Sequence, residues 1–294
     1  PTTYIPGQTM ILHFNFTFQG GILIMIYKKY GETFLKLRKQ KGFNLIYFEQ
    51  LGISKSSLGK FERGESMLGF DKLTTALQVL SVTLGEYENL LNDFELDIHE
   101  LLIQKIITTH ALNQPQKMSE LYQEACEIDE IYLALAIKGE YDSLTFDELG
   151  ALIDYFENIK VWRDIDLSTL YLSLKHLNAK EISYILDQFL IDGHVIFNSL
   201  NHRTRFSHVA YHAVAILIAK GYKELAQHTL AHVDSHHLKQ TMFINNLRKL
   251  VEGYWIAVFE DSEQGNQQMD EALKRFDDLS DYKVSQYYKR IYHA

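Results

Sequence analysis

Apolar residues recur at helical spacing in residues 27–92, and glycines separate the short segments. Leu45, Phe48 and Leu51 repeat every three residues, and Leu58 and Phe61 lie about one turn apart. Each predicted helix therefore has one face for a core. The pattern continues through a further set of apolar positions, Leu73, Leu77, Val79, Leu80 and Leu84. Five helices in roughly sixty residues, with glycine at the breaks, predict a helix-turn-helix domain.

Residues 97–294 are nearly free of proline and rich in Leu, Ile, Tyr and Phe, and only short polar turns interrupt them. This composition predicts a large all-α domain with a continuous core. The expected helices are 97–112, 116–127, 129–139, 146–160, 166–177, 180–192, 203–221, 222–235, 239–260, 263–279 and 281–292. In the last helix, we expect Tyr282, Tyr287, Tyr288 and Ile291 to offer an apolar dimer interface.

A weak internal repeat links the helices of this second region. The run from Ala219 to Ala226 is expected to turn one helix into the next, and the run from Glu263 to Met269 to do the same about forty residues later. Helix pairs that repeat on this scale predict a tetratricopeptide-like solenoid, in which stacked units share a core. The expected fold is thus an all-α chain with a helix-turn-helix domain followed by such a solenoid.

Charge is distributed unevenly along the chain. Between Lys28 and Arg63 nine Lys or Arg stand against three Glu, a balance of +6, and no charged residue precedes Lys28. Because the whole chain carries −9, everything after Arg63 carries −15. Phosphate would attract the first region and repel the second, as expected for a basic DNA-binding head on an acidic body.

The run from Gly52 to Ser66 carries the most specific functional signal. It places a turn glycine and a serine N-cap before a short helix with polar, cationic and small residues outward, which suits insertion into the DNA major groove. We expect these side chains to contact base edges or phosphate: Lys55, Ser56, Ser57 and Lys60. Lys36 and Arg38 on the first helix are expected to contact the DNA backbone. Arg63 fits an internal ion pair or a phosphate contact equally well.

The segment resembles the lambda-repressor-like (Xre-type) class of helix-turn-helix domains. The runs Ile53-Ser54-Lys55-Ser56 and Phe61-Glu62-Arg63-Gly64-Glu65-Ser66 resemble, more specifically, the Rgg/GadR/MutR regulators of Gram-positive bacteria. The run from Phe243 to Tyr254 is similar to the carboxy-terminal region of the same family. The resemblance covers nearly everything after Met25 and is most specific in the head.

The resemblance implies a cytoplasmic, homodimeric transcriptional regulator that binds double-stranded promoter DNA. It also implies that the repeat domain binds a short hydrophobic signalling peptide in a groove. Arginine forks and amides can pair with a peptide backbone and its terminal carboxylate. The candidates are Arg163, Arg203, Arg205, His212, Asn246 and Arg248, each of which also fits an ordinary surface or helix-helix contact.

Residues 1–26 differ from the rest of the chain. Pro1 to Ile24 is uncharged and rich in aromatic residues, lacks the features of a secretory signal, and has no apolar stretch long enough to span a bilayer. We expect this segment to be a leader that precedes a natural start at Met25, with a strand-like arm as the alternative. The expected domains are therefore 27–92 for DNA binding and 97–294 for peptide binding and dimerisation. The single cysteine, Cys126, suits a reducing cytoplasm.

Histidines form a second unusual feature, because eight of the thirteen fall between His194 and His237. His228, His232 and His236 recur every fourth residue and would align on one helix face, with His208 and His212 as a second pair. Solvated or packed histidines are the favoured interpretation over a zinc or copper site, and a pH-responsive element is a third. We expect no metal, no cofactor and no catalysis, since no enzyme motif of recognisable spacing is present. The alternative functions are a protein-interaction adaptor and a small-molecule, metal or pH sensor.

Overall fold

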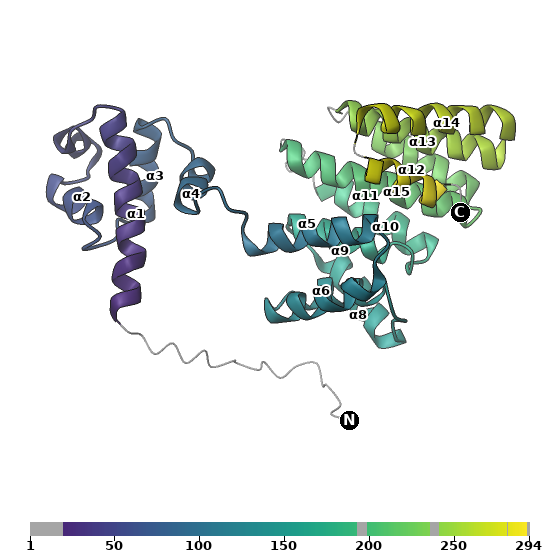
Figure 1. The fold of residues 1–294 in the computed structure, drawn as a ribbon, viewed down its shortest axis with the longest axis horizontal. Helices are drawn as coiled ribbons and strands as arrows, with labels where there is room; N and C mark the ends of the chain where they lie inside the picture. Colours follow the sequence, from purple (N-terminus) through teal and green to yellow (C-terminus); the bar gives the residue numbers. More distant parts are fainter. Residues whose placement is uncertain (1–19, 193–198, 236–240, 281, 293–294) are drawn as a thin grey trace, which may run out of the picture. The chain divides into compact units, whose positions relative to one another are not determined.

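The computed structural model describes residues 20–192, 199–235, 241–280 and 282–292. All regular structure in these ranges is helical, which confirms the all-α prediction (Figure 1). The chain divides into two compact units, unit 1 (Pro1–Leu96) and unit 2 (Asp97–Ala294). None of the helices in the described ranges combines the length and the apolar character needed to cross a membrane.

Unit 1 contains the five helices that the apolar spacing predicts. They are α1 (Gly20–Gln40), the 3-10 helix η1 (Leu45–Leu51), α2 (Lys55–Glu62), α3 (Phe70–Val79) and α4 (Leu84–Leu91). Helix α1 begins inside the segment expected to be a leader, and residues 1–19 of that segment lie outside the described residues.

The turn between η1 and α2 follows from its residue types. Gly52 ends η1 with φ of 75°, a left-handed conformation that glycine adopts without steric cost. The hydroxyl of Ser54 then caps α2 by accepting a hydrogen bond from the backbone N–H of Ser57 at 3.1 Å. The predicted turn glycine and serine cap are therefore both in place.

Helix α2 is fixed on α1 by a close backbone approach and a buried ion pair. A Cβ atom on Gly31 of α1 would lie 1.9 Å from the carbonyl oxygen of Phe61, so only glycine fits at this crossing. Arg38 of α1 donates from Nε and Nη2 to the two carboxylate oxygens of Glu62, at 2.5 and 2.8 Å, and from Nη1 to the carbonyl oxygen of Phe43. The aromatic rings of Phe34, Phe48 and Phe61 pack beneath, all without solvent exposure.

Unit 2 consists of eleven helices in the described ranges, and each matches one predicted from the sequence. They are α5 (Ile98–Ala111), α6 (Pro115–Glu127), α7 (Ile131–Lys138), α8 (Phe146–Asn158), α9 (Asp164–Ser173), α10 (Ala179–Asp192), α11 (Leu200–Ala219), α12 (Lys223–Ser235), α13 (Met242–Phe259), α14 (Ser262–Leu279) and α15 (Tyr282–Tyr292). The most extensive contacts between consecutive helices join α13 to α14, α6 to α7 and α11 to α12, and α7, α9, α11 and α13 also pack in series.

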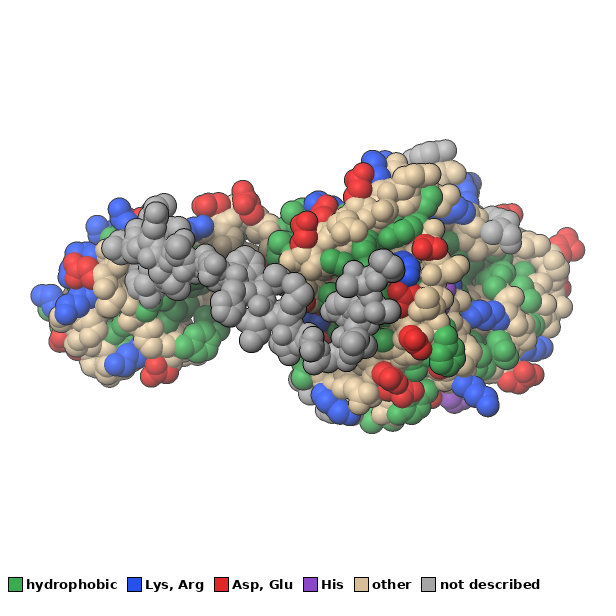
Figure 2. Space-filling model, turned by 90° about the horizontal axis from the view of Figure 1, so that it is seen from below, with side chains coloured by type: hydrophobic (Ala, Val, Ile, Leu, Met, Phe, Trp, Pro, Cys, Tyr) green, Lys and Arg blue, Asp and Glu red, His purple; other side chains and the backbone are tan. Residues whose placement is uncertain are grey.

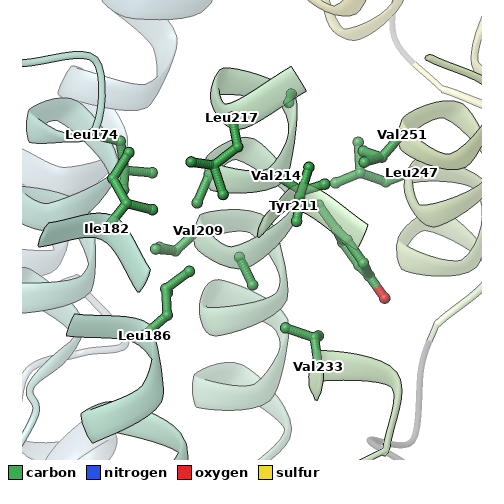
Figure 3. Packing of buried hydrophobic residues seen from close by; sticks show 14 of the residues in the cluster. Leu174, Ile182, Leu186, Val209, Tyr211, Val214, Leu217, Val233, Leu247 and Val251 are labelled. Carbon is green, nitrogen blue, oxygen red and sulfur yellow. The ribbon is translucent and has the colours of Figure 1, made fainter. Parts of the chain in front are cut away.

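Helix α11 forms the centre of the unit 2 core. Figure 3 shows its Val209 and Leu217 directed toward Leu174, Ile182 and Leu186 of the preceding elements. Its Tyr211 and Val214 lie toward a second set from the elements that follow, Val233, Leu247 and Val251. Because α11 packs against neighbours on two sides, most of its faces carry apolar residues.

The run from Glu263 to Met269 is not a turn, contrary to the repeat argument. It lies inside α14, and the turn falls at Glu260 and Asp261, where the Asp261 carboxylate caps the helix. Gly265 serves a different purpose, because a Cβ atom there would lie 2.2 Å from the backbone nitrogen of Ala257. The glycine permits close packing of α13 and α14.

Tyr287 and Tyr288 of α15 face into unit 2 and not outward as a dimer interface would require, while the side chain of Tyr282 lies outside the described residues. Tyr287 and Tyr288 are only 8% and 6% exposed. Tyr288 stacks on Phe276 with ring centroids 4.9 Å apart, and the Tyr287 hydroxyl hydrogen bonds with that of Tyr171 on α9. Burial raises the pKa of both α15 phenols well above the usual value.

Two half-buried histidines of α11 lie beside these tyrosines. The ring of His212 stacks on Tyr171 with centroids 4.4 Å apart, and Tyr288 lies within 3.4 Å of Nδ1 of His208. Burial, aided by the nearby His110, lowers the pKa of His212 to about 3, and burial next to Arg205 lowers the pKa of His208 to about 4. Both rings are therefore neutral at physiological pH.

The buried Arg38–Glu62 pair predicts that loss of one of its charges strongly lowers the unfolding free energy of unit 1. Glu62→Gln leaves the Arg38 guanidinium buried without its counter-charge, and we expect unit 1 to lose about 3–5 kcal/mol of unfolding free energy. Hydrogen–deuterium exchange of α1 and α2 amides in the full chain measures this loss. The control is Glu124→Gln, which removes an exposed pair with Lys105 and should change stability by less than about 1 kcal/mol. If Glu62→Gln left the exchange protection of the α1 amides unchanged, the Arg38–Glu62 pair would not stabilise unit 1 as proposed.

The two α11 histidines predict acid sensitivity of unit 2. Because their folded pKa values lie below the usual 6.5, the unfolded chain binds more protons between about pH 6.5 and pH 3, and the unfolding free energy falls as pH decreases through that window. His212→Phe keeps a ring against Tyr171 and should flatten this decline. Urea unfolding at several pH values, followed by the fluorescence of Trp162 and Trp255 in unit 2, measures how the unfolding free energy changes with pH. His228→Phe at an exposed position is the control and should leave the decline unchanged.

Candidate functional site

The outward side of α2 carries the exposed polar residues expected from the sequence. Lys55, Ser56 and Lys60 are exposed, and neither lysine forms an ion pair within the described residues. Leu58 and Phe61, on the opposite side, are fully buried. The helix therefore presents two unpaired cations and a free hydroxyl on a rigid support.

Ser57 differs from its neighbours because its hydroxyl belongs to the helix cap. Its Oγ accepts a hydrogen bond from the Ser54 hydroxyl at 2.8 Å. Glu49 of η1 also supports this end of α2, because its carboxylate accepts the backbone N–H of Lys55 at 3.2 Å. The sequence analysis missed Glu49, whose role depends on the approach of η1 to α2.

Of the two candidates on α1, only Lys36 is exposed. The expectation that Arg38 contacts the DNA backbone is not supported, because its side chain is 9% exposed and its guanidinium is bound to Glu62 and Phe43. Arg38 holds α2 on α1 instead. Lys39 and Lys41 at the end of α1, and Lys72 on α3, add exposed cations to unit 1. Figure 2 shows lysine and arginine side chains at several points on the surface of this unit.

Arg63 forms an exposed fork with Glu65. Its Nε and Nη2 donate to the two carboxylate oxygens at 2.5 and 2.9 Å. This hydrogen bonding raises the pKa of Arg63 and lowers the pKa of Glu65. The Arg63 side chain remains 60% exposed, so the pair leaves part of the guanidinium open to a ligand.

Three arginine candidates of unit 2 are engaged in internal ion pairs. Arg163 contacts Glu130 and Asp166, and its hydrogen bonds with Asp166 and Glu130 raise its pKa. Arg205 on α11 donates to Glu100 on α5 at 2.6 Å and lies 3.4 Å from Asp164.

Arg248 on α13 forks onto Asp234 of α12, with three donated hydrogen bonds between 2.6 and 2.9 Å, and also contacts Glu252. The bond to Asp234 raises its pKa. These pairs hold neighbouring helices together and account for the arginines without any ligand.

The remaining unit 2 candidates have unequal access to solvent. Asn246 donates from Nδ2 to the carbonyl oxygen of Ala272 at 2.8 Å, while its buried Oδ1 has no hydrogen-bond partner in the described structure. Arg203 is partly buried on α11. His212 is half-buried, and its ring stacks on Tyr171.

A polar hollow of 420 Å³ lies along α13 and α14, and its lining contains none of the six peptide candidates. It is lined by Lys249, Glu252, Gln264, Gln267, Gln268, Glu271 and Arg275. The six candidates belong to α9, α11 and α13, which pack in series, with Arg163 at the N-cap of α9.

The histidine stripe is only partly described. The rings of His228 and His232 lie 5.9 Å apart, and Nδ1 of His232 is 3.0 Å from Asp187. His236 lies outside the described residues. Within the ranges that the structure covers, no three His, Cys, Asp or Glu side chains are grouped to hold a metal ion.

Comparison with known proteins identifies the fold. No family model matches the chain. The SHP pheromone receptor Rgg2 of Streptococcus dysgalactiae matches with a TM-score of 0.71 and 18% identity, over 90% of this chain and 98% of that chain. The PrgX/cCF10 complex matches with a TM-score of 0.64 and 15% identity, over 90% of each chain. A bacterial peptide pheromone/receptor complex gives a TM-score of 0.64 at 15% identity, over 90% of this chain and 96% of that chain.

These matches span both units and extend over nearly the whole of each known protein. They confirm, at the level of the fold, the resemblance to Rgg-type regulators that the head motif carries. The chain has the fold of the pheromone receptor Rgg2 and of PrgX.

Proposed function

We propose that this chain is a DNA-binding transcriptional regulator whose activity is controlled by a short signalling peptide. The observation that carries the proposal is the outward side of α2, where Lys55, Ser56 and Lys60 are exposed and the lysines unpaired within the described structure. A short, capped helix with unpaired cations on a fixed support suits insertion into the major groove.

The roles within this surface differ with the chemistry of each side chain. Ser56 near the start of α2 is free to hydrogen bond a base edge, whereas Ser57 already accepts one hydrogen bond from Ser54 and keeps its donor and one acceptor lone pair. Lys55 and Lys60 supply charge to base edges or phosphates, and Lys36 supplies charge from α1 to the backbone. The net charge of +6 between Lys28 and Arg63 supports the same surface.

The peptide input is proposed on the similarity of the chain to a bacterial peptide pheromone/receptor complex and to the SHP pheromone receptor Rgg2. The arginines of unit 2 already bind carboxylates, so a peptide carboxylate would compete with an acidic residue of the chain for the same fork. Arg163 is the best placed for such an exchange, because its side chain is 52% exposed whereas its partner Glu130 is 15% exposed. The proposed peptide is short and hydrophobic.

We further propose that the protein acts as a cytoplasmic homodimer on a palindromic site. One copy of α2 reaches one half-site, and two copies related by a two-fold axis reach both. The single Cys126 suits a reducing compartment. Sedimentation of the protein with operator fragments carrying one or two half-sites tests the dimer.

Substitution of the two unpaired lysines predicts a defined salt effect. Lys55→Ala and Lys60→Ala should each weaken binding to a promoter fragment and, where the lysine contacts phosphate, reduce the slope of log affinity against log salt by about one. Titration by fluorescence anisotropy at several salt concentrations measures both quantities. Lys105→Ala on α5 removes the same charge from unit 2 and should leave binding unchanged. No salt-sensitive binding by the unmodified protein would refute the DNA-binding function.

The peptide input predicts a bound ligand in the native protein. The full chain purified from its own cells should release a short peptide on acid treatment, and mass spectrometry would identify it. Adding that synthetic peptide should change promoter affinity. A metal ion or small molecule released in its place would support the sensor alternative.

A further inference from the structure

The Arg63–Glu65 pair orients a guanidinium on the surface of unit 1. Both oxygens of the Glu65 carboxylate accept hydrogen bonds from one edge of Arg63, made of Nε and Nη2. A two-point fork of this kind fixes the plane of the guanidinium as well as its position. The side chains are nevertheless 60% and 49% exposed, so the fixed group faces solvent.

Gly59 allows this guanidinium to lie against α2. A Cβ atom on Gly59 would be 3.3 Å from Nη1 of Arg63, closer than side chains ordinarily pack. Positions three, four and seven apart share a helix face, so Ser56, Gly59 or Lys60, and Arg63 lie along one side of α2. The guanidinium therefore lies on the side of α2 that carries Ser56 and Lys60.

We propose that Arg63, buttressed by Glu65, contacts a guanine in the major groove and determines sequence specificity. The hydrogen bonds to Glu65 use the edge of the guanidinium formed by Nε and Nη2. The opposite edge, formed by Nη1 and Nη2, still has one N–H group on each nitrogen that points outward. Two parallel donors match O6 and N7, the two acceptors that guanine presents in the major groove. Adenine presents a donor beside its single acceptor there and is rejected. The inference rests on the proposed DNA-binding function.

Charge favours a base contact over a phosphate contact at this position. A phosphate requires mainly a cation, and the negative charge of Glu65 beside Arg63 weakens the attraction. A base edge requires a fixed direction of two N–H groups, which the fork supplies before DNA arrives. Pre-organisation lowers the entropy that is lost when the contact forms.

The experiment measures base preference rather than affinity alone. In vitro selection with the full chain gives the preferred site, and competition with fragments altered at each base pair gives the discrimination. Arg63→Lys keeps the charge but loses the fork, and should reduce discrimination for one G·C pair per half-site by about tenfold. Glu65→Gln should reduce discrimination at the same base pair. Preferences at the other positions should persist.

Glu32→Gln is the matched control, because Glu32 is also 49% exposed and paired, with Lys28 on α1. It should leave every base preference unchanged. Circular dichroism verifies that each variant is folded. Uniformly weaker binding of Arg63→Lys and Arg63→Ala to all fragments, with no change in preference, would make Arg63 a phosphate contact and overturn the inference while the DNA-binding function stands. Absence of DNA binding by the unmodified protein would instead overturn both.

Discussion

The crossing of α1 and α2 is the constraint on which the candidate DNA surface depends. Gly31 brings the two backbones so close that the Phe61 carbonyl occupies the place of a side chain. The buried Arg38–Glu62 fork then selects one orientation of α2, because desolvation of both charges is offset only when the two-point geometry forms. The positions of Lys55, Ser56 and Lys60 follow from that orientation. A surface that contacts base edges needs such rigidity, since its hydrogen bonds are directional.

The two units also differ in how their cations are used. In unit 2, Arg163, Arg205 and Arg248 are each paired with carboxylates of neighbouring helices, so they stabilise packing and contribute little free charge. In unit 1, Lys55 and Lys60 have no such partners among the described residues. The difference in pairing is confined to these residues, because Arg38 and Arg63 of unit 1 are paired as well. Attraction of phosphate to unit 1 follows from its net positive charge and from the exposed lysines of α2.

The helices were predictable because each depends on local periodicity, and the cap at Ser54 because it depends on four consecutive residues. The burial of Arg38 was not, since its partner Glu62 lies 24 residues away and only the folded crossing brings them together. Arg205 and Glu100 are 105 residues apart, and no spacing rule links them. Gly265 was misassigned because a glycine that permits close helix packing has the same sequence appearance as a turn glycine. The polar face of α2 was predictable, whereas the pairing of Arg63, which follows α2, with Glu65 was not.

Helix α15 makes unit 2 more than a simple stack of repeats. In a solenoid each repeat contacts only its neighbours, and stability is a sum of local terms. Here Arg290 donates to the carbonyl oxygens of His110 and Ala111 in α5, contacts that span 180 and 179 residues of sequence. Tyr287 reaches α9, and Tyr288 packs on α14 and near His208 of α11. Helix α15 thus contacts the first helix of the unit as well as later ones. A change in any of these helices therefore alters the environment of Tyr287, Tyr288 or Arg290. The tyrosines expected to join two copies of the chain thus join the two ends of one unit.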